Sequence, residues 1–292
     1  NFPDKSYRHC TQMDKLLAMP SVKSVPKIPE DLEKYQEIFL NFHVVVELSR
    51  NGPSPRMAIN GKRLAYPSSP PITFPETNSF KSCRLCDELT VFRNICECSH
   101  VIQVPLGTVV QLVLFSITQI PVGLSHPIHL HGHEFHVLKT GYGQYDNVTG
   151  MLLDVTHDID CHGDMYCHRA TWTNKDWHGD DIPELNMVRP PVKDTVIVPH
   201  GGYVVIRFTA DNPGWWIMHC HVEHHLLEGM ALLFKVGEDS DISKPPKNFH
   251  TCGDFQMSEK EFEEKLEGPE KTPFSIQTLN VKINSQTPTH GK

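Results

Sequence analysis

The sequence predicts an all-β fold, an antiparallel sandwich or barrel, on the basis of three observations. Short runs of β-branched and aromatic residues recur along the 292-residue chain, and turn-forming residues separate them. Proline accounts for 23 residues, which favours loops and strand edges over long helices. Few segments have the spacing of an amphipathic helix. With 39% hydrophobic residues the chain can bury a core, so a wholly disordered protein is excluded.

The chain begins with a segment that we expect to be a connector from a preceding domain. Residues 1–34 contain four prolines and no long periodic run. The first clear strand is predicted at residues 38–48, and residues 49–82 are expected to form loops with short strands. The further strands are predicted at residues 101–104, 108–115, 134–138, 195–198, 203–209, 215–218 and 231–236.

Two turn signals and one helix signal complete the pattern. Residues 101–104 and 108–115 are expected to form a strand pair, and Gly201-Gly202 predicts a hairpin. A capping box at residues 258–261 begins a short helix, which Gly268-Pro269 ends. The expected organisation is a connector at 1–34, one domain at 35–240 and a C-terminal extension with the helix and a tail at 241–292.

The net charge and the hydropathy argue against a nucleic-acid partner and against a membrane-spanning segment. The net charge is −8 and no basic run is present, which argues against nucleic acid as the main partner. The most apolar stretch, residues 104–117, is shorter than the about 18 residues of a membrane span and contains Gly107 and Gln111. Asn147-Val148-Thr149 is an acceptor sequence for N-glycosylation, so we expect a secreted glycoprotein.

Histidine is the unusual feature of the composition, and it is concentrated in two clusters. Of 19 histidines, 15 lie between His100 and His225. Residues 126–133 read His-Pro-Ile-His-Leu-His-Gly-His, and residues 219–225 read His-Cys-His-Val-Glu-His-His. Residues two apart on a strand face the same side. The pair His129 and His131 can therefore point to one site, and so can the histidines on either side of Cys220.

Cys220 would point to the opposite face of its strand, where a second site is expected. A thiolate, two imidazoles and a distant thioether form the ligand set of a blue-copper site. Cys220, His225 and Met230 follow one another at intervals of five residues, and His126 can supply the second imidazole. Zinc also binds histidine and cysteine. A structural zinc site would need neither Met230 nor ligands on both faces of one strand, so the pattern favours copper.

The two clusters together resemble the C-terminal copper signatures of multicopper oxidases. Residues 190–195, 202–208, 211–216 and 248–254 resemble animal laccases in particular. The resemblance covers about residues 36–255. It implies a Greek-key cupredoxin β-sandwich that is the third of three such domains.

The resemblance also implies the role of each ligand. The type 1 copper would be held by His126, Cys220 and His225, with Met230 axial. His129 would bind the type 2 copper, and His131, His219 and His221 would bind the type 3 pair. Cys220, His225, His219 and His221 would then be the catalytic residues of electron transfer.

The chain departs from the family pattern in the number of its histidine ligands. The family's trinuclear cluster takes eight histidines, four from the first domain and four from the third. No His-Trp-His or His-Ser-His motif is present to supply the other four. We therefore expect missing N-terminal cupredoxin domains, in cis or in trans. His224 replaces an aromatic residue of the family pattern, and His133 and His136 are expected to lie outside the ligand set.

The function implied is that of a secreted, laccase-like copper oxidoreductase. The intact enzyme would oxidise phenols or aromatic amines by single electrons and reduce dioxygen to water, and the isolated chain would be inactive. One alternative is ferroxidase activity, which requires carboxylates near the type 1 site, with Glu134, Glu223 and Glu228 as candidates. A second is a copper-binding protein without turnover. A third is a pair of chains that share their eight histidines.

The eight cysteines other than Cys220 allow two interpretations. The spacings of Cys83 with Cys86 and of Cys96 with Cys98 are compatible with zinc. Disulfides are favoured in a secreted protein, and a bond between residues 161 and 167 would close a short loop. The connectivity stays open at this point.

Overall fold

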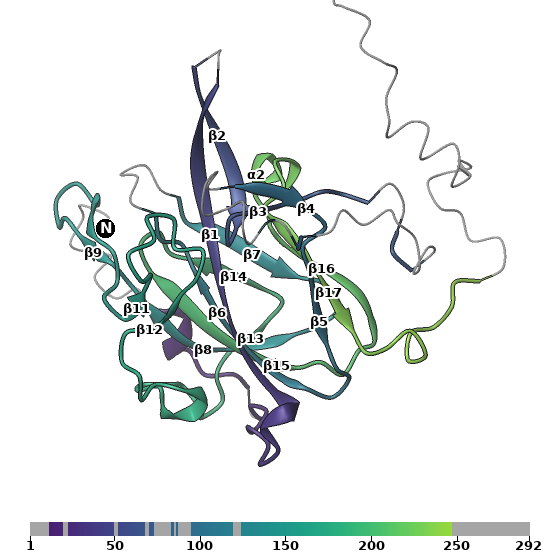
Figure 1. The fold of residues 1–292 in the computed structure, drawn as a ribbon. Helices are drawn as coiled ribbons and strands as arrows, with labels where there is room; N and C mark the ends of the chain where they lie inside the picture. The colour runs from purple at the N-terminus through teal and green to yellow at the C-terminus, as the bar shows by residue number, and fades with distance from the viewer. Residues whose placement is uncertain are drawn as a thin grey trace, which may run out of the picture. The chain divides into compact units, whose positions relative to one another are not determined.

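The computed structural model describes residues 12–19, 23–49, 52–67, 70–72, 83–84, 86, 95–118 and 124–246 (Figure 1). The chain divides into two compact units, residues 1–247 and 248–292, and every described residue belongs to the first. The predicted helix at residues 258–267 and the tail lie outside the described residues. The predicted connector contains the short 3-10 turns η2 (Met13–Lys15) and η3 (Leu32–Lys34).

Two large sheets form the sandwich of the first unit, which confirms the predicted all-β sandwich of cupredoxin type. The larger sheet has the order β13-β8-β15-β6-β1-β2-β3-β4, and the smaller has the order β14-β7-β16-β17-β5. The strands of the larger sheet are β1 (Tyr35–Ser49), β2 (Gly52–Ile59), β3 (Lys62–Leu64), β4 (Cys96–Cys98), β6 (Val109–Phe115), β8 (Phe135–Gly141), β13 (Val192–Lys193) and β15 (Tyr203–Thr209). Those of the smaller are β5 (Val101–Val104), β7 (His126–Leu130), β14 (Thr195–Val198), β16 (Gly214–Cys220) and β17 (Ala231–Val236).

The main core lies between the two sheets. One cluster of buried side chains contains Leu112 and Ile206 from the larger sheet together with Ile128 and Leu232 from the smaller. Alternate residues of each strand point into this layer, as expected for two sheets packed face to face. Cys220 and Met230 belong to the same cluster. Two of the predicted ligands are therefore part of the hydrophobic core.

Two predicted strand pairings are wrong. Residues 101–104 and 108–115 do not pair, because β5 pairs with β17 while β6 pairs with β1 and β15. Gly201-Gly202 joins β14 to β15, and these strands belong to different sheets. Turn residues set where the chain reverses, but not which sheet it enters next. Connections that cross from one sheet to the other are the mark of a Greek-key sandwich.

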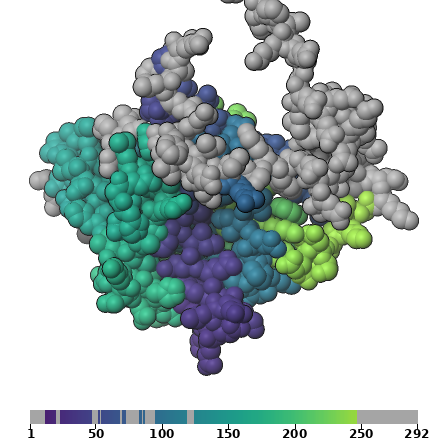
Figure 2. Space-filling model, viewed as in Figure 1, coloured from purple at the N-terminus to yellow at the C-terminus, as the bar shows by residue number. Residues whose placement is uncertain are grey.

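A long insertion covers the outer face of the larger sheet. Residues 142–191 contain the small sheets β9 (Gln144–Tyr145) with β10 (Leu152–Asp154) and β11 (Ile159–Asp160) with β12 (Thr171–Trp172). They also contain the 3-10 turn η4 (Gly179–Asp181). Trp172 and Ile182 pack on Phe115 and Tyr203 in a second core cluster. In Figure 2 this insertion, in teal and green, forms the flank beside the purple N-terminal segment.

Arg207 of β15 lies fully buried beneath this insertion. Its Nε and Nη2 donate to Gln111 Oε1 at 2.9 and 2.5 Å, and its Nη1 lies 2.7 Å from Asp180 Oδ1. Gln111 in turn donates to Glu37, which also accepts from the ring nitrogen of Trp172. A buried charge that is hydrogen-bonded on all sides is costly to leave without its partners. The network therefore ties the insertion to the sheet.

We expect Arg207→Met to destabilise the protein by about 2 kcal/mol, the usual cost of leaving a buried acceptor without its donor. The loss follows because Gln111 Oε1 would stay buried and lose both of the guanidinium donors that it now accepts from. Urea denaturation followed by circular dichroism measures the change. Arg169→Met, at an exposed position of the same insertion, is the matched control. Equal stability of the two variants would contradict the role of the network.

Candidate metal centre

The first centre brings together three side chains from three different elements. His126 begins β7, Cys220 ends β16, and His225 lies on the short helix α2 (Glu223–Leu227). The Cys220 Sγ lies 3.6 Å from His126 Nδ1 and 3.5 Å from His225 Nδ1. Metal bonds of about 2.0–2.3 Å at tetrahedral angles separate such ligand atoms by about 3.5 Å. The spacing therefore fits one small metal ion.

Met230 lies next to these residues at the end of the connection from β16 to β17. Its side chain is fully buried in the cluster that contains Cys220. The Cys220 backbone N–H donates to the Met230 carbonyl at 3.1 Å, and the Met230 N–H donates to the His225 carbonyl at 2.9 Å. The backbone thus ties Met230 to two of the other predicted ligands.

Burial determines the protonation of the first centre. It raises the pKa of the Cys220 thiol to about 11 and lowers the pKa of His126 to about 3. It also lowers the pKa of His225, with a smaller contribution from His224. The imidazoles are therefore neutral at pH 7 and keep a lone pair for a metal. A soft, thiophilic cation that displaces the thiol proton would complete the site, and copper meets this requirement.

A second centre lies on the other side of Cys220, where four histidines meet. The Nε2 atoms of His131 and His219 are 3.2 Å apart. The ring centroids of His129 lie 4.6 Å from His131, 5.6 Å from His219 and 6.1 Å from His221. The two-residue period of a strand predicted that these histidines would converge. His131 nevertheless lies just beyond the strand, because β7 ends at Leu130. Gly132 (φ +71°) follows in a turn, where a Cβ atom would lie 2.3 Å from the Trp216 ring.

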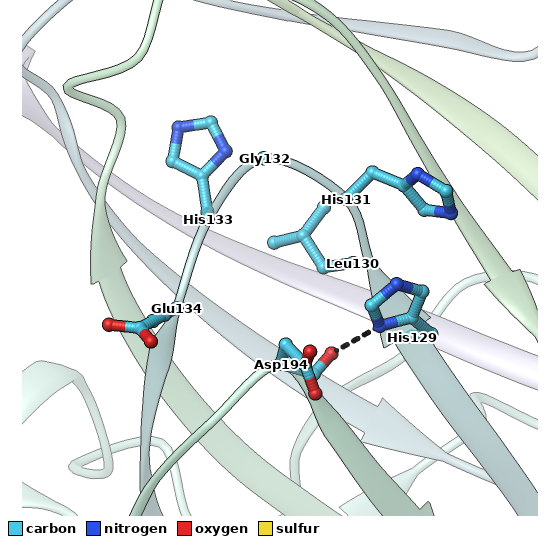
Figure 3. Close-up of a pocket in the computed structure, with 7 residues that line it drawn as sticks. All are labelled: His129, Leu130, His131, Gly132, His133, Glu134 and Asp194. Carbon is cyan, nitrogen blue, oxygen red and sulfur yellow. Dashed lines mark hydrogen bonds between the residues drawn. The ribbon is translucent and has the colours of Figure 1, made fainter.

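Backbone carbonyls orient two of these rings. A carbonyl only accepts, so the Nδ1 of His129 donates to the Asp194 oxygen at 2.9 Å (Figure 3). In the same way the Nδ1 of His219 donates to the Cys220 oxygen at 3.0 Å. With Nδ1 as the donor, each ring can present its Nε2 lone pair to the centre. Burial first, and then the neighbouring imidazoles, lower the pKa of His131 and of His219.

The second centre is open on one side. His131 and His221 are exposed. A pocket beside them is lined by His129, Leu130, His131, Gly132, His133, Glu134 and Asp194. Figure 3 shows Glu134 and the ring of His133 turned away from His129 and His131. Among the described residues, the four imidazoles thus lie together on one side of this centre, and the other side is open.

The three histidines expected to lie outside the ligand set have other surroundings. The His133 ring packs 5.2 Å from Phe208. His136 donates through Nε2 to the Lys23 carbonyl at 3.0 Å. His224 is exposed, with its ring 6.3 Å from that of His225.

Six of the eight other cysteines form disulfides, which join Cys83 to Cys98, Cys86 to Cys96 and Cys161 to Cys167. Cys220 is the free cysteine of the part that the structure describes. The sulfur atoms of Cys83, Cys86 and Cys98 lie close enough together to bind a metal, but they are bonded in disulfides and so cannot act as thiolate ligands. The structure therefore resolves the choice between zinc and disulfides in favour of disulfides.

Sequence reasoning missed the groups that hydrogen-bond to the predicted ligands and to the residues between them. The carbonyl of Asp194, which bonds His129, is 65 residues away in the chain. Arg56 and Arg63 bond Glu228, which lies in the connection between β16 and β17 at residues 221–230 (the ligand connection), and they are 172 and 165 residues away from it. Sequence spacing carries no signal for such contacts, because the fold alone brings these groups together.

Comparison with known proteins gives a family match and several relatives. The family described as multicopper oxidase matches residues 70–240. Putative laccase-17 of Oryza sativa subsp. japonica is 32% identical, and laccase-12 of Arabidopsis thaliana is 31% identical, each over 191 residues. Each alignment covers 64% of this chain and 27% of the relative, so the chain spans about a quarter of their length. The solved structure of Fet3p, a multicopper oxidase that functions in iron import, is similar with a TM-score of 0.45 and 22% identity, over 95% of this chain and 47% of that one.

Proposed function

Since the chain belongs to the multicopper oxidase family, a family of copper-dependent oxidoreductases, we propose that it is the third cupredoxin domain of a secreted, laccase-like enzyme. The whole enzyme removes single electrons from phenols or aromatic amines and reduces dioxygen to water. The position of Cys220 between His219 and His221 carries the proposal, because one short segment then supplies ligands to both centres. The domain comprises residues 35–240, with a connector at 1–34 and an extension at 241–292.

The two centres differ in what this chain contributes. His126, Cys220, His225 and Met230 would hold the type 1 copper. His129 would bind the type 2 copper, and His131, His219 and His221 would bind the type 3 pair. Copper at these sites supplies the one-electron redox chemistry. The chain itself fixes the tautomers of His129 and His219 and excludes water from the first centre, where His126 and His225 are 1% and 4% exposed.

The surroundings of His225 favour an organic substrate over ferrous iron. Of the three candidate carboxylates, Glu228 is paired with Arg56 and Arg63, each at 3.3 Å. Glu134 lines the pocket of the other centre. Glu223 alone is left as an exposed carboxylate on the helix of His225. Leu227 of the same helix is 77% exposed and offers an apolar surface to an aromatic ring.

Side-by-side turnover of a phenol and of ferrous iron by the whole enzyme tests this assignment. We expect kcat/KM to be higher for the phenol, and Glu223→Gln to leave the phenol reaction unchanged. Faster turnover of ferrous iron that Glu223→Gln removes would favour the ferroxidase alternative.

Secretion and glycosylation are part of the proposal. Asn147 is exposed between β9 and β10. Three disulfides are typical of an oxidising compartment. In the described part of the chain no helix has the length and apolar character needed to cross a membrane.

Met230→Leu is expected to keep the copper and the blue colour while raising the reduction potential. The thioether is a weak axial donor that favours the oxidised metal, so its loss favours the cuprous state. Redox titration of the absorption band measures the potential. Met218→Leu, in the same core cluster, is the matched control. If Met230→Leu leaves the potential unchanged or lowers it, Met230 acts as core packing and not as a ligand.

A further inference from the structure

We propose that Arg63, assisted by Arg56, is a positioning residue that holds His225 and Met230 in place through Glu228. This inference rests on the proposed copper site at His126, Cys220, His225 and Met230. It concerns a contact between the two sheets that lies outside both ligand sets.

The four ligands fall into two groups that are held in different ways. His126 lies on β7 opposite Val198 of β14, and Cys220 lies on β16 opposite Ile128 of β7. Ladder hydrogen bonds of the smaller sheet fix both positions. His225 and Met230 lie on the connection between β16 and β17, where no strand ladder holds the backbone. Apart from the backbone bonds that join Met230 to Cys220 and to His225, this half of the ligand set depends on contacts from outside the smaller sheet.

Those contacts come from the strands β2 and β3 of the larger sheet and from Tyr66, just after β3. Arg63 donates through Nε to the Glu228 carbonyl at 2.7 Å and through Nη2 to the Glu228 carboxylate at 3.3 Å. Arg56 donates to the same carboxylate oxygen at 3.3 Å. The Leu64 backbone N–H donates to the Gly229 carbonyl at 2.9 Å, and the Tyr66 hydroxyl donates to the Leu226 carbonyl at 2.5 Å. These contacts tie the segment between His225 and Met230 to this edge of the larger sheet.

The packing at Gly229 leaves this segment no room to move toward β3. Gly229 has φ +92°, and a Cβ atom there would lie 3.1 Å from both the Arg63 Cβ and the Leu64 backbone nitrogen. Leu64 packs in turn with Ala231 and Leu233, the residues that follow Met230 into β17. A shift of β3 would therefore be passed on to the ligand connection.

The supporting edge of the larger sheet is itself anchored by disulfides. β4 pairs with β3, and its two cysteines are bonded to Cys83 and Cys86. Glu97, between those cysteines, lies 3.6 Å from Arg63 through its carboxylate. The Arg63 guanidinium thus contacts Glu97 of β4 on one side and Glu228 of the ligand connection on the other.

Arginine suits this role better than lysine. Its planar group presents several donors in a fixed arrangement, so Nε reaches a carbonyl while Nη2 reaches a carboxylate of the same residue. A lysine has one nitrogen and keeps the charge without this geometry. The comparison of Arg63→Lys with Arg63→Met therefore separates the effect of charge from that of orientation.

The test uses the whole enzyme and follows the type 1 copper by its spectrum. Arg63→Met is expected to weaken copper binding at this site by about 10–100-fold, the usual cost of losing a group that orients a ligand. It should also shift the blue absorption band and its EPR signal, with Arg63→Lys intermediate and Arg56→Met milder. Lys175→Met, an exposed lysine of the insertion, is the control and should match the wild type. Circular dichroism of the copper-free variants establishes that the fold is retained.

The outcomes separate this inference from the proposed function. A wild type without a blue band that depends on Cys220 would overturn the proposed copper site itself. A wild type with such a band, and an Arg63→Lys variant that folds with the same band position, EPR signal and copper affinity, would overturn the positioning role alone. If Arg63→Met fails to fold, the Arg63→Lys and Arg56→Met spectra decide the question.

Discussion

Replacing Cys220 by serine is expected to abolish the intense blue absorption at about 600 nm that is typical of a type 1 copper site. The colour arises from charge transfer between a thiolate sulfur and copper, and a hydroxyl is too hard a ligand to replace the thiolate. Cys220 is fully buried between His126 and His225. Among the described residues it is the cysteine with a free thiol, so it is the one that can provide a thiolate. Absorption and EPR spectra of the copper-loaded protein measure the loss.

Serine is close to cysteine in size, so the fold should survive the substitution. Equal thermal unfolding of the copper-free variant and wild type verifies this. His224→Gln is the matched control, because His224 is exposed beside His225 and lies outside the proposed ligand set. A strong blue band in Cys220→Ser would show that the type 1 assignment is mistaken.

The proposed ligands could be found from the sequence because they are local in the chain. A strand places residues two apart on one face, so the motif around Cys220 already assigns His219 and His221 to one side and the sulfur to the other. The structure brings the same residues into two groups. The Nε2 atoms of His131 and His219 are 3.2 Å apart, and the Cys220 Sγ lies 3.5 Å from His225 Nδ1. Short motifs with a fixed period carry this information without the rest of the fold.

The arrangement of strands could be predicted only in part. β14, β15 and β17 have the predicted bounds, because their apolar runs end at turn residues. Residues 105–107 and Gly201-Gly202 lead the chain from one sheet to the other, which a local turn signal cannot distinguish from a hairpin. The contact of Arg63 with Glu228 spans 165 residues and depends on how the two sheets are packed. What the sequence left open is therefore the non-local part of the fold.

The copper-loaded chain, tested alone, is expected to bind about one copper tightly and to show no sustained oxygen consumption with a phenol in excess. It holds all four proposed type 1 ligands, but only His129, His131, His219 and His221 for the other centre. In that centre His131 and His221 are exposed, so the remaining coordination positions face solvent. A cluster with half of its ligands binds metal weakly and cannot hold the ions that dioxygen reduction requires.

A copper titration, an oxygen electrode and the native mass together measure this expectation. The chain should be reduced once by the phenol, with loss of the blue colour and little oxygen uptake. Adding N-terminal cupredoxin domains that supply four further histidines, in cis or as a second chain, should restore turnover. Full copper loading and turnover by a dimer would instead favour the sharing of eight histidines between two copies. Sustained uptake by a verified monomer would refute the argument, because the described residues offer that centre four imidazoles, on one side only.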